Sequence, residues 1–215
     1  SIGQVITRQY GDILHYDLTM TLEDNEYLDG IYTELMDDRN VEYAVPYMTY
    51  SAMAKSDDEE KAIQVYVMDD RDIYDVIDLK DRKTKEKLSI RDGAVISEKY
   101  AKLCNIKVGD TIVVESANGI KKDIEISGIC EMYTQHFLFI GDKYYEDIFN
   151  ETVYCDNIAV DAVDNNELLA KFEDTEGIKT IADFADTIAT FSSMLDTLDI
   201  IVVVIIVAGG SLALV

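Results

Sequence analysis

The protein has 215 residues, of which 48% are hydrophobic and 29% charged, a composition that argues against disorder over most of the chain. It holds 43 Asp and Glu against 19 Lys and Arg, which gives a formal net charge of −24. This surplus of acidic residues argues against binding a nucleic-acid backbone. It also disfavours an anionic lipid surface, because both partners require a positive protein surface.

The amino-terminal stretch has a helical repeat before the first strand. Residues 16–22 alternate between apolar and polar, which predicts a half-buried strand. Asp24 or Asn25 then caps a predicted helix with an apolar side. The amino-terminal repeat consists of Ile2, Val5, Ile6, Gln9, Tyr10 and Ile13, and the apolar side of the capped helix consists of Leu28, Ile31, Tyr32 and Leu35.

Two strands are predicted next, at residues 41–50 and 63–68. Pro46, the one proline of the chain, predicts that the first is an edge strand or a bulged one. The densely charged segment DDRDIYDVIDLKDRKTKEK, residues 69–87, resembles a passage between subdomains.

The middle of the chain predicts a short strand at residues 94–96, a helix capped by Ser97 and ended by Asn105, and a hairpin. The hairpin pairs residues 111–115 with 120–127 across Asn118-Gly119, a dipeptide that favours tight β-turns. Further on we expect strands at 137–140 and 157–163, a short helix at 142–149, and a helix over Leu168, Leu169 and Phe172. Strands and helices mix without regular alternation, so the expected fold class is α+β.

The last 16 residues, 200–215, contain no charge, although the chain as a whole is strongly acidic. As a helix they would extend about 24 Å of the roughly 30 Å of a bilayer core, so we expect them to be the truncated start of a transmembrane helix. The alternative is a buried strand, because residues 200–207 are rich in β-branched side chains. No basic residue follows Lys179, which places the domain on the outer side of the membrane.

The segment before this run has apolar residues at alternating steps of three and four, the spacing of a packed helical seam. We predict a single stalk helix with this seam leading into the bilayer. A packed helix at the domain surface is the alternative. The seam consists of Ile181, Phe184, Ile188, Phe191, Leu195 and Leu198.

Sites for chemistry are scarce in the sequence. His15 and His136 are far apart and outside any zinc-binding motif, and no nucleotide-binding loop or nucleophile motif occurs. Cys104, Cys130 and Cys155 are widely spaced; we favour three buried free thiols, with a bond between Cys130 and Cys155 as the alternative. We therefore expect no catalytic residue, no cofactor, no metal and no enzymatic activity.

The order of these features resembles the extracytoplasmic domain of FtsX-like ABC transporter permeases, the relatives of MacB, in the form found in Gram-positive bacteria. The resemblance rests on RQYGDILHYDLTMTL, DGAVISEKYAKLCNIKVGDTIVV and SGICEMYTQHFLFIGDKYYEDIF, followed by the amphipathic helix and the apolar run. Its most specific part is ISEKYAKLCNIKVGDTI, residues 96–112.

The resemblance implies a two-lobed, mixed α/β domain flanked by membrane-proximal helices. Mapped onto this chain, residues 1–78 and 163–198 would form a discontinuous membrane-proximal lobe, residues 79–162 an inserted distal lobe, and residues 199–215 the beginning of a transmembrane helix. It also implies a place at the extracellular face of the plasma membrane.

The implied partners are a cytoplasmic ABC ATPase, reached through membrane segments absent from this sequence, a second permease copy in a homo- or heterodimer, and the lipid bilayer. The implied function is to transmit ATP-driven motion to an external client: a lipid, a peptide, a lipoprotein or a cell-wall factor. A membrane-anchored binding module or receptor with a single span is the first alternative, and a tethered hydrolase is the second.

Overall fold

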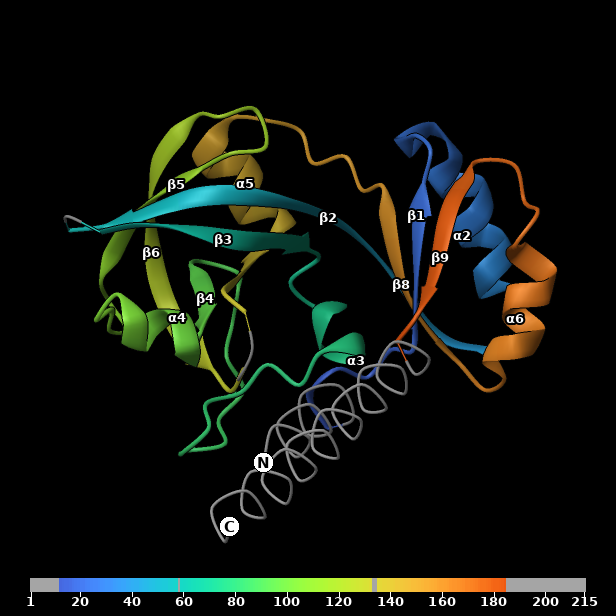
Figure 1. The fold of residues 1–215 in the computed structure, drawn as a ribbon, viewed down its shortest axis with the longest axis horizontal. Coiled ribbons are helices and arrows are strands. Elements are labelled where there is room, and N and C mark those ends of the chain that lie inside the picture. Colours follow the sequence, from blue (N-terminus) through green and yellow to red (C-terminus); the bar gives the residue numbers. More distant parts are fainter. Residues whose placement is uncertain (1–11, 58, 133–134, 185–215) are drawn as a thin grey trace, which may run out of the picture.

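A computed structural model describes residues 12–57, 59–132 and 135–184 (Figure 1). Most of the amino-terminal repeat, the seam positions after Phe184 and the apolar run lie outside these residues. Within them, no helix is both long enough and apolar enough to cross a bilayer. The elements are β1 (Leu18–Leu22), the 3-10 helix η2 (Asn25–Tyr27), α2 (Leu28–Met36), β2 (Val41–Ser56), β3 (Glu59–Met68), α3 (Ile73–Val76), β4 (Ala94–Ser97), α4 (Glu98–Leu103), β5 (Thr111–Glu115), β6 (Lys121–Cys130), β7 (Phe137–Gly141), α5 (Asp142–Phe149), β8 (Asn157–Ala162), α6 (Asn165–Phe172) and β9 (Ile178–Asp183).

One part of the molecule is a β-α-β-β-α-β unit with the strand order β2-β8-β1-β9, in which every neighbouring pair is antiparallel. This is the ferredoxin-like arrangement. Both helices cover the same face of the sheet, at the right of Figure 1. The sequence LTMTL of β1 alternates, so Leu18, Met20 and Leu22 all point into the core under α2 and α6.

The other part is a closed ring of strands inserted between β2 and β8, at the left of Figure 1. Its order is β2-β3-β7-β4-β6-β5, and a short pairing of β5 with Ala54 and Lys55 returns the ring to β2. Its core contains Tyr100 of α4 and Tyr145 of α5, both fully buried. We call this part the strand ring.

β2 belongs to both parts. Its first half pairs with β8 as far as Tyr47, and from Tyr47 onward it pairs with β3. Pro46 lies at the changeover, where β2 has a partner on one side only, so its missing N–H interrupts no ladder on the other side. The prediction of an edge position is therefore confirmed locally, while the bulge of this pairing lies between Val41 and Tyr43.

Most local predictions are confirmed. The hairpin of β5 and β6 turns at Gly119, which has a positive φ of 83°, and the helices α2, α5 and α6 form where expected. β2 and β3 are longer than predicted. Ser97 occupies the N-cap position of α4 without capping it, because its hydroxyl accepts the N–H of Phe137 and donates to the carbonyl of Gln135.

The division into lobes at residues 79 and 162 stays a prediction. β8, assigned to the inserted lobe, pairs with β1 and β2. β3, assigned to the membrane-proximal lobe, pairs with β7. Strand pairing thus crosses both predicted boundaries.

Gly→Ala substitutions at two positions with different backbone conformations test the backbone described here. Gly177, before β9, has φ +89°, and an added Cβ would lie 2.3 Å from the ring of Tyr27. Gly30 lies in α2 with open space around it. We expect Gly177→Ala to lower the unfolding free energy by about 2 kcal/mol and Gly30→Ala to raise it by about 0.5–1 kcal/mol, measured by urea denaturation. Equal shifts of the same sign would contradict the backbone described here.

Candidate functional site

The chain enters and leaves the described domain at one place. β1 and β9 pair in antiparallel register from Leu18 with Asp183, so the start of one strand lies beside the end of the other. The N–H of Phe184 continues this pairing with a 2.8 Å hydrogen bond to the carbonyl of Asp17. The rings of Tyr16 and Phe184 meet edge to face, with centroids 5.4 Å apart. The two ends of the described chain are therefore in direct contact.

The segment that leads into β1 is also hydrogen-bonded to α3 and the residues after it. α3 is the short helix between β3 and β4. The N–H of His15 donates to the carbonyl of Val76 at 2.7 Å, and the N–H of Asp78 donates to the carbonyl of Ile13 at 2.8 Å. Leu14 forms an isolated antiparallel bridge with Ile77. We call Ile13–Tyr16, Phe184 and the segment 76–78 the junction.

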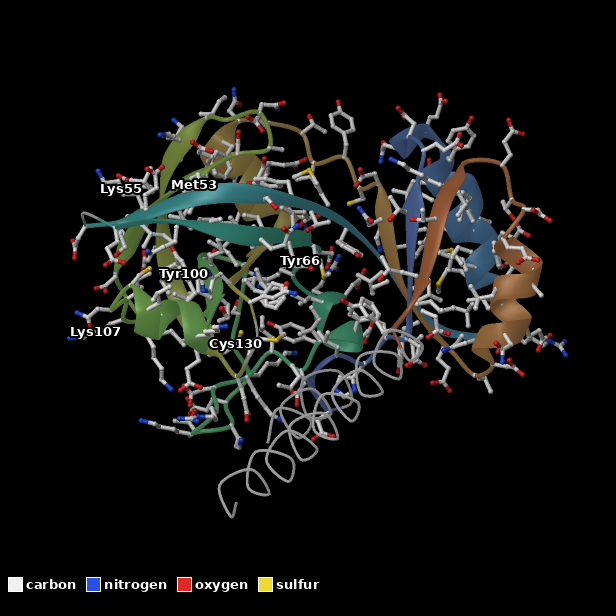
Figure 2. All side chains as sticks on the ribbon, in the orientation of Figure 1. Met53, Lys55, Tyr66, Tyr100, Lys107 and Cys130 are labelled. Atoms are coloured by element: carbon white, nitrogen blue, oxygen red, sulfur yellow. The ribbon has the colours of Figure 1, made fainter. Side chains whose placement is uncertain are left out.

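A hydrophobic core joins the junction to both parts of the molecule. Ile13 and Tyr16 are buried in it, and Phe184 packs against it. Figure 2 shows Tyr66 of β3 between the strand ring and α3, and its ring stacks on Phe139 at a centroid distance of 5.5 Å. The other buried contributors are Val45 and Tyr47 of β2, Met68 of β3, Ile73 and Val76 of α3, Val95 of β4, Cys130 of β6, Phe137 of β7 and Ala159 of β8, together with Ile77, Leu79, Ile90 and Met132 from the connecting segments.

Acidic side chains lie near this core on the sheet. Burial first, and then the carboxylates of Asp17 and Glu42, raise the pKa of Asp161, while His15 acts in the opposite direction. The junction is therefore locally acidic as well as apolar.

The structure describes two of the predicted seam positions. Phe184 contacts Tyr16, as described above, and its role in a helical seam stays a prediction. Ile181 is not helical: it belongs to β9, opposite Met20, and packs on the core under the helices. The predicted start of the stalk helix at Ile181 is therefore wrong. Ile188, Phe191, Leu195 and Leu198 lie outside the described residues. Tyr16 was predicted only as the start of a strand, and its partnership with Phe184 was missed.

A group of carboxylates lies away from the junction. One carboxylate oxygen from each of Asp69, Asp70 and Asp142 lies within 4.8 Å of the others. Arg71 pairs with Asp69 at 3.1 Å and Arg91 with Asp70 at 2.6 Å. The hydrogen bond from Arg71 is the main cause that lowers the pKa of Asp69, whereas burial raises the pKa of Asp142. We interpret this group as an ion-pair cluster.

The three cysteines are free thiols. Burial raises the pKa of Cys130, and burial with nearby Asp142 and Asp156 raises the pKa of Cys155 to about 11. All three pKa values lie above the ordinary thiol value, so these groups are protonated at neutral pH and poor nucleophiles. A bond between Cys130 and Cys155 is not present.

The fold and the junction together define a two-part mixed α/β domain that receives both ends of its chain at one place. Neither a protein-family model nor a curated protein matches the sequence. Among solved structures, the periplasmic region of MacB from Actinobacillus actinomycetemcomitans is similar, with a TM-score of 0.53 and 13% sequence identity over 89% of this chain and 97% of that one.

The extracellular domain of the noncanonic ABC-type transporter YknZ from Gram-positive bacteria also matches, with a TM-score of 0.47 and 14% identity over 72% of this chain and 87% of that one. The chain thus has the fold of the MacB periplasmic region, and the resemblance given by the sequence is confirmed at the level of the fold.

Proposed function

We propose that this chain is the extracellular domain of an ABC transporter permease, lying at the outer face of the plasma membrane between two transmembrane helices. In this role it is not an enzyme. It transmits the motion that ATP binding produces in a cytoplasmic ATPase to an external client. A second permease copy is the expected partner in the membrane.

The observation that carries the proposal is the junction. Both ends of the described chain meet there, hydrogen-bonded and ring-packed on each other, and the incoming end is hydrogen-bonded to α3 as well. A movement applied to the ends would thus reach the ferredoxin-like unit through β1 and β9 and the strand ring through α3. Packed interfaces of this kind favour discrete positions, which suits a mechanical relay.

The predicted seam extends the same proposal toward the membrane. Ile188, Phe191, Leu195 and Leu198 would form the packed face of the stalk helix that begins after β9. Phe184 would then be the link between the stalk and the domain.

Thiol labelling in intact cells tests the location. Val163, in the connection between β8 and α6, is 71% exposed, whereas Cys104 and Cys130 are buried. In the full protein, Val163→Cys should react with a membrane-impermeant maleimide in intact cells, well above the parent protein with its native thiols. Labelling that requires lysis would overturn the extracellular assignment.

Co-purification separates the permease from its first alternative. The full protein should be isolated from membranes together with an ABC ATPase subunit. A protein with a single span and no ATPase partner would instead be an anchored binding module or receptor.

A further inference from the structure

Positive charge is concentrated in one stretch of this acidic chain. Residues 79–107 contain nine Lys and Arg and four Asp and Glu, whereas the rest of the protein contains 10 basic and 39 acidic residues. The stretch comprises the connection from α3 to β4, β4 itself, α4 and the turn after it. Residues 79–107 therefore carry a net positive charge, although the protein as a whole is strongly negative.

This stretch begins at the junction. Asp78 donates its backbone N–H to Ile13, and two residues later Lys80 forms an antiparallel bridge with Lys87. The turn between them, residues 82–87, is exposed. In Figure 1 this turn projects on the lower side of the molecule, the side on which the described chain enters at Asp12 and leaves at Phe184.

Three cations of the stretch form ion pairs but stay partly exposed. Lys85 pairs at 3.2 Å with Glu131, which lies outside the stretch and whose side chain is only 2% exposed. Within the stretch, Glu98 pairs with both Arg82, at 3.0 Å, and Lys102, at 2.8 Å. The side chains of Arg82, Lys85 and Lys102 are 42%, 52% and 66% exposed, so water still reaches these cations.

Four cations of the stretch have no carboxylate within ion-pair distance in the described part of the chain. Lys87 lies 3.4 Å from the centroid of the Tyr74 ring, which orients it without neutralising it. Figure 2 shows Lys107 at the outer edge of the strand ring, to the left of α4. The four are Lys83, Lys87, Lys99 and Lys107.

Apolar groups accompany these charges. A cavity of ≈ 400 Å³ lies between α4 and the exposed turn, with Arg82, Lys83 and Lys102 among its polar lining residues and Ile106 and Val108 among its apolar ones. Val108 is 60% exposed. Cations beside exposed apolar side chains match the chemistry of a phospholipid surface, where phosphate lies above glycerol and acyl chains.

We propose that residues 79–107 form a docking surface for the anionic phospholipid headgroups of the bilayer on which the domain stands. The inference rests on the proposed function, which places the junction toward that bilayer. Ionic screening reduces interactions beyond about 8 Å at physiological salt, so the charges nearest the surface decide the sign of the interaction, while the distant acidic residues contribute little. At this surface, the attraction between the basic residues and the lipid headgroups outweighs the repulsion expected from the net charge of −24.

Vesicle binding of the 215-residue chain tests this surface independently of ATPase coupling. We expect the chain to bind phosphatidylcholine vesicles containing phosphatidylglycerol at least about tenfold more tightly than pure phosphatidylcholine vesicles at physiological salt, where the screening length is about 8 Å. The preference should vanish in about 1 M NaCl, where the screening length is about 3 Å. The uncharged run of residues 200–215 would contribute equally to the binding of both vesicles, so the ratio isolates the charge effect. A ratio near one, or a preference for neutral vesicles, would overturn the docking surface.

Two double variants, each lacking two lysines, show which surface causes the preference for anionic vesicles. K83Q/K87Q should remove most of the preference, since each lysine near an anionic surface contributes about fivefold. K121Q/K122Q removes the same charge from the opposite end of β6, about 30 Å along that strand from Cys130, whose neighbour Glu131 donates its N–H to the carbonyl of Lys80. This control should keep the preference. Equal losses in the two variants, with native circular dichroism in both, would refute the assignment to residues 79–107.

A further measurement separates membrane lipid from a free anion. Inorganic phosphate should displace the chain from anionic vesicles no better than NaCl at equal ionic strength. Specific displacement would assign the surface to a small anion and overturn the lipid proposal. A failed vesicle test leaves thiol labelling and ATPase co-purification unaffected, so the two proposals fail separately.

Discussion

Phe184→Ala should uncouple ATP hydrolysis from transport or resistance in the full permease, with activity falling by about tenfold or more while expression is retained. The side chain of Phe184 joins the end of β9 to Tyr16 by an edge-to-face contact and lies against the core that binds α3. Coupling free energies between distant sites are typically about 1–3 kcal/mol, which corresponds to about 5- to 150-fold. Loss of this contact removes a direct link between the two ends of the chain.

A double-mutant cycle distinguishes transmission from general destabilisation. Tyr16→Ala should have an effect similar to Phe184→Ala, and the double variant should be little worse than either, because the two side chains act through one contact. Tyr16→Phe keeps the ring and should be active. Tyr43→Ala removes an exposed tyrosine from β2 of the same sheet and serves as the control. Coupling that is normal in both alanine variants would refute the role of the junction.

Local signals in the sequence were sufficient for most individual elements. The Asn118-Gly119 turn specifies its own hairpin, because the one positive φ that the turn requires falls on Gly119 and the flanking strands follow directly. Asp24 caps η2 through a hydrogen bond to the N–H of Glu26, and Asn150 ends α5 in the left-handed conformation. Such features depend on neighbours within a few residues, so one sequence can predict them.

Ile181 shows why the seam was misread. Ile181 and Phe184 are three residues apart, which is the step of a helix, but Ile181 lies within β9, pairs with Met20 and packs on the core under α2 and α6. Phe184 follows the strand and packs on the core at the junction. Only the long-range pairing of β1 with β9 separates the two interpretations, and a single sequence does not contain it.

The same limit applies to the candidate site. The sequence suggested that both chain ends lead to a membrane. It gave no signal that Tyr16 meets Phe184, since the contact depends on closing a loop of more than 160 residues. The continuation of β2 from one part of the fold into the other was likewise hidden, because Pro46 predicted only an edge strand or a bulged one at the point where β2 exchanges β8 for β3.

Phe172→Ala should lower the unfolding free energy of the chain by about 3–5 kcal/mol, a loss comparable with the whole stability of many domains. Phe172 is the last residue of α6 and is fully buried under the β1 and β8 sheet, in a core it shares with Leu35 of α2. Removing its ring leaves a cavity that the surrounding helices and strands fill only in part. Urea denaturation followed by circular dichroism measures the change.

The matched control lies on the other helix of the same unit. Met36 ends α2 with 53% of its surface exposed, so Met36→Ala should change the unfolding free energy by less than about 0.5 kcal/mol. A small effect of Phe172→Ala, equal to that of Met36→Ala, would mean that α6 does not cover the sheet as described. The proposed role of the junction would then be weakened as well, because Tyr16 and Phe184 flank β1 and β9, two strands that pack on the core under α2 and α6.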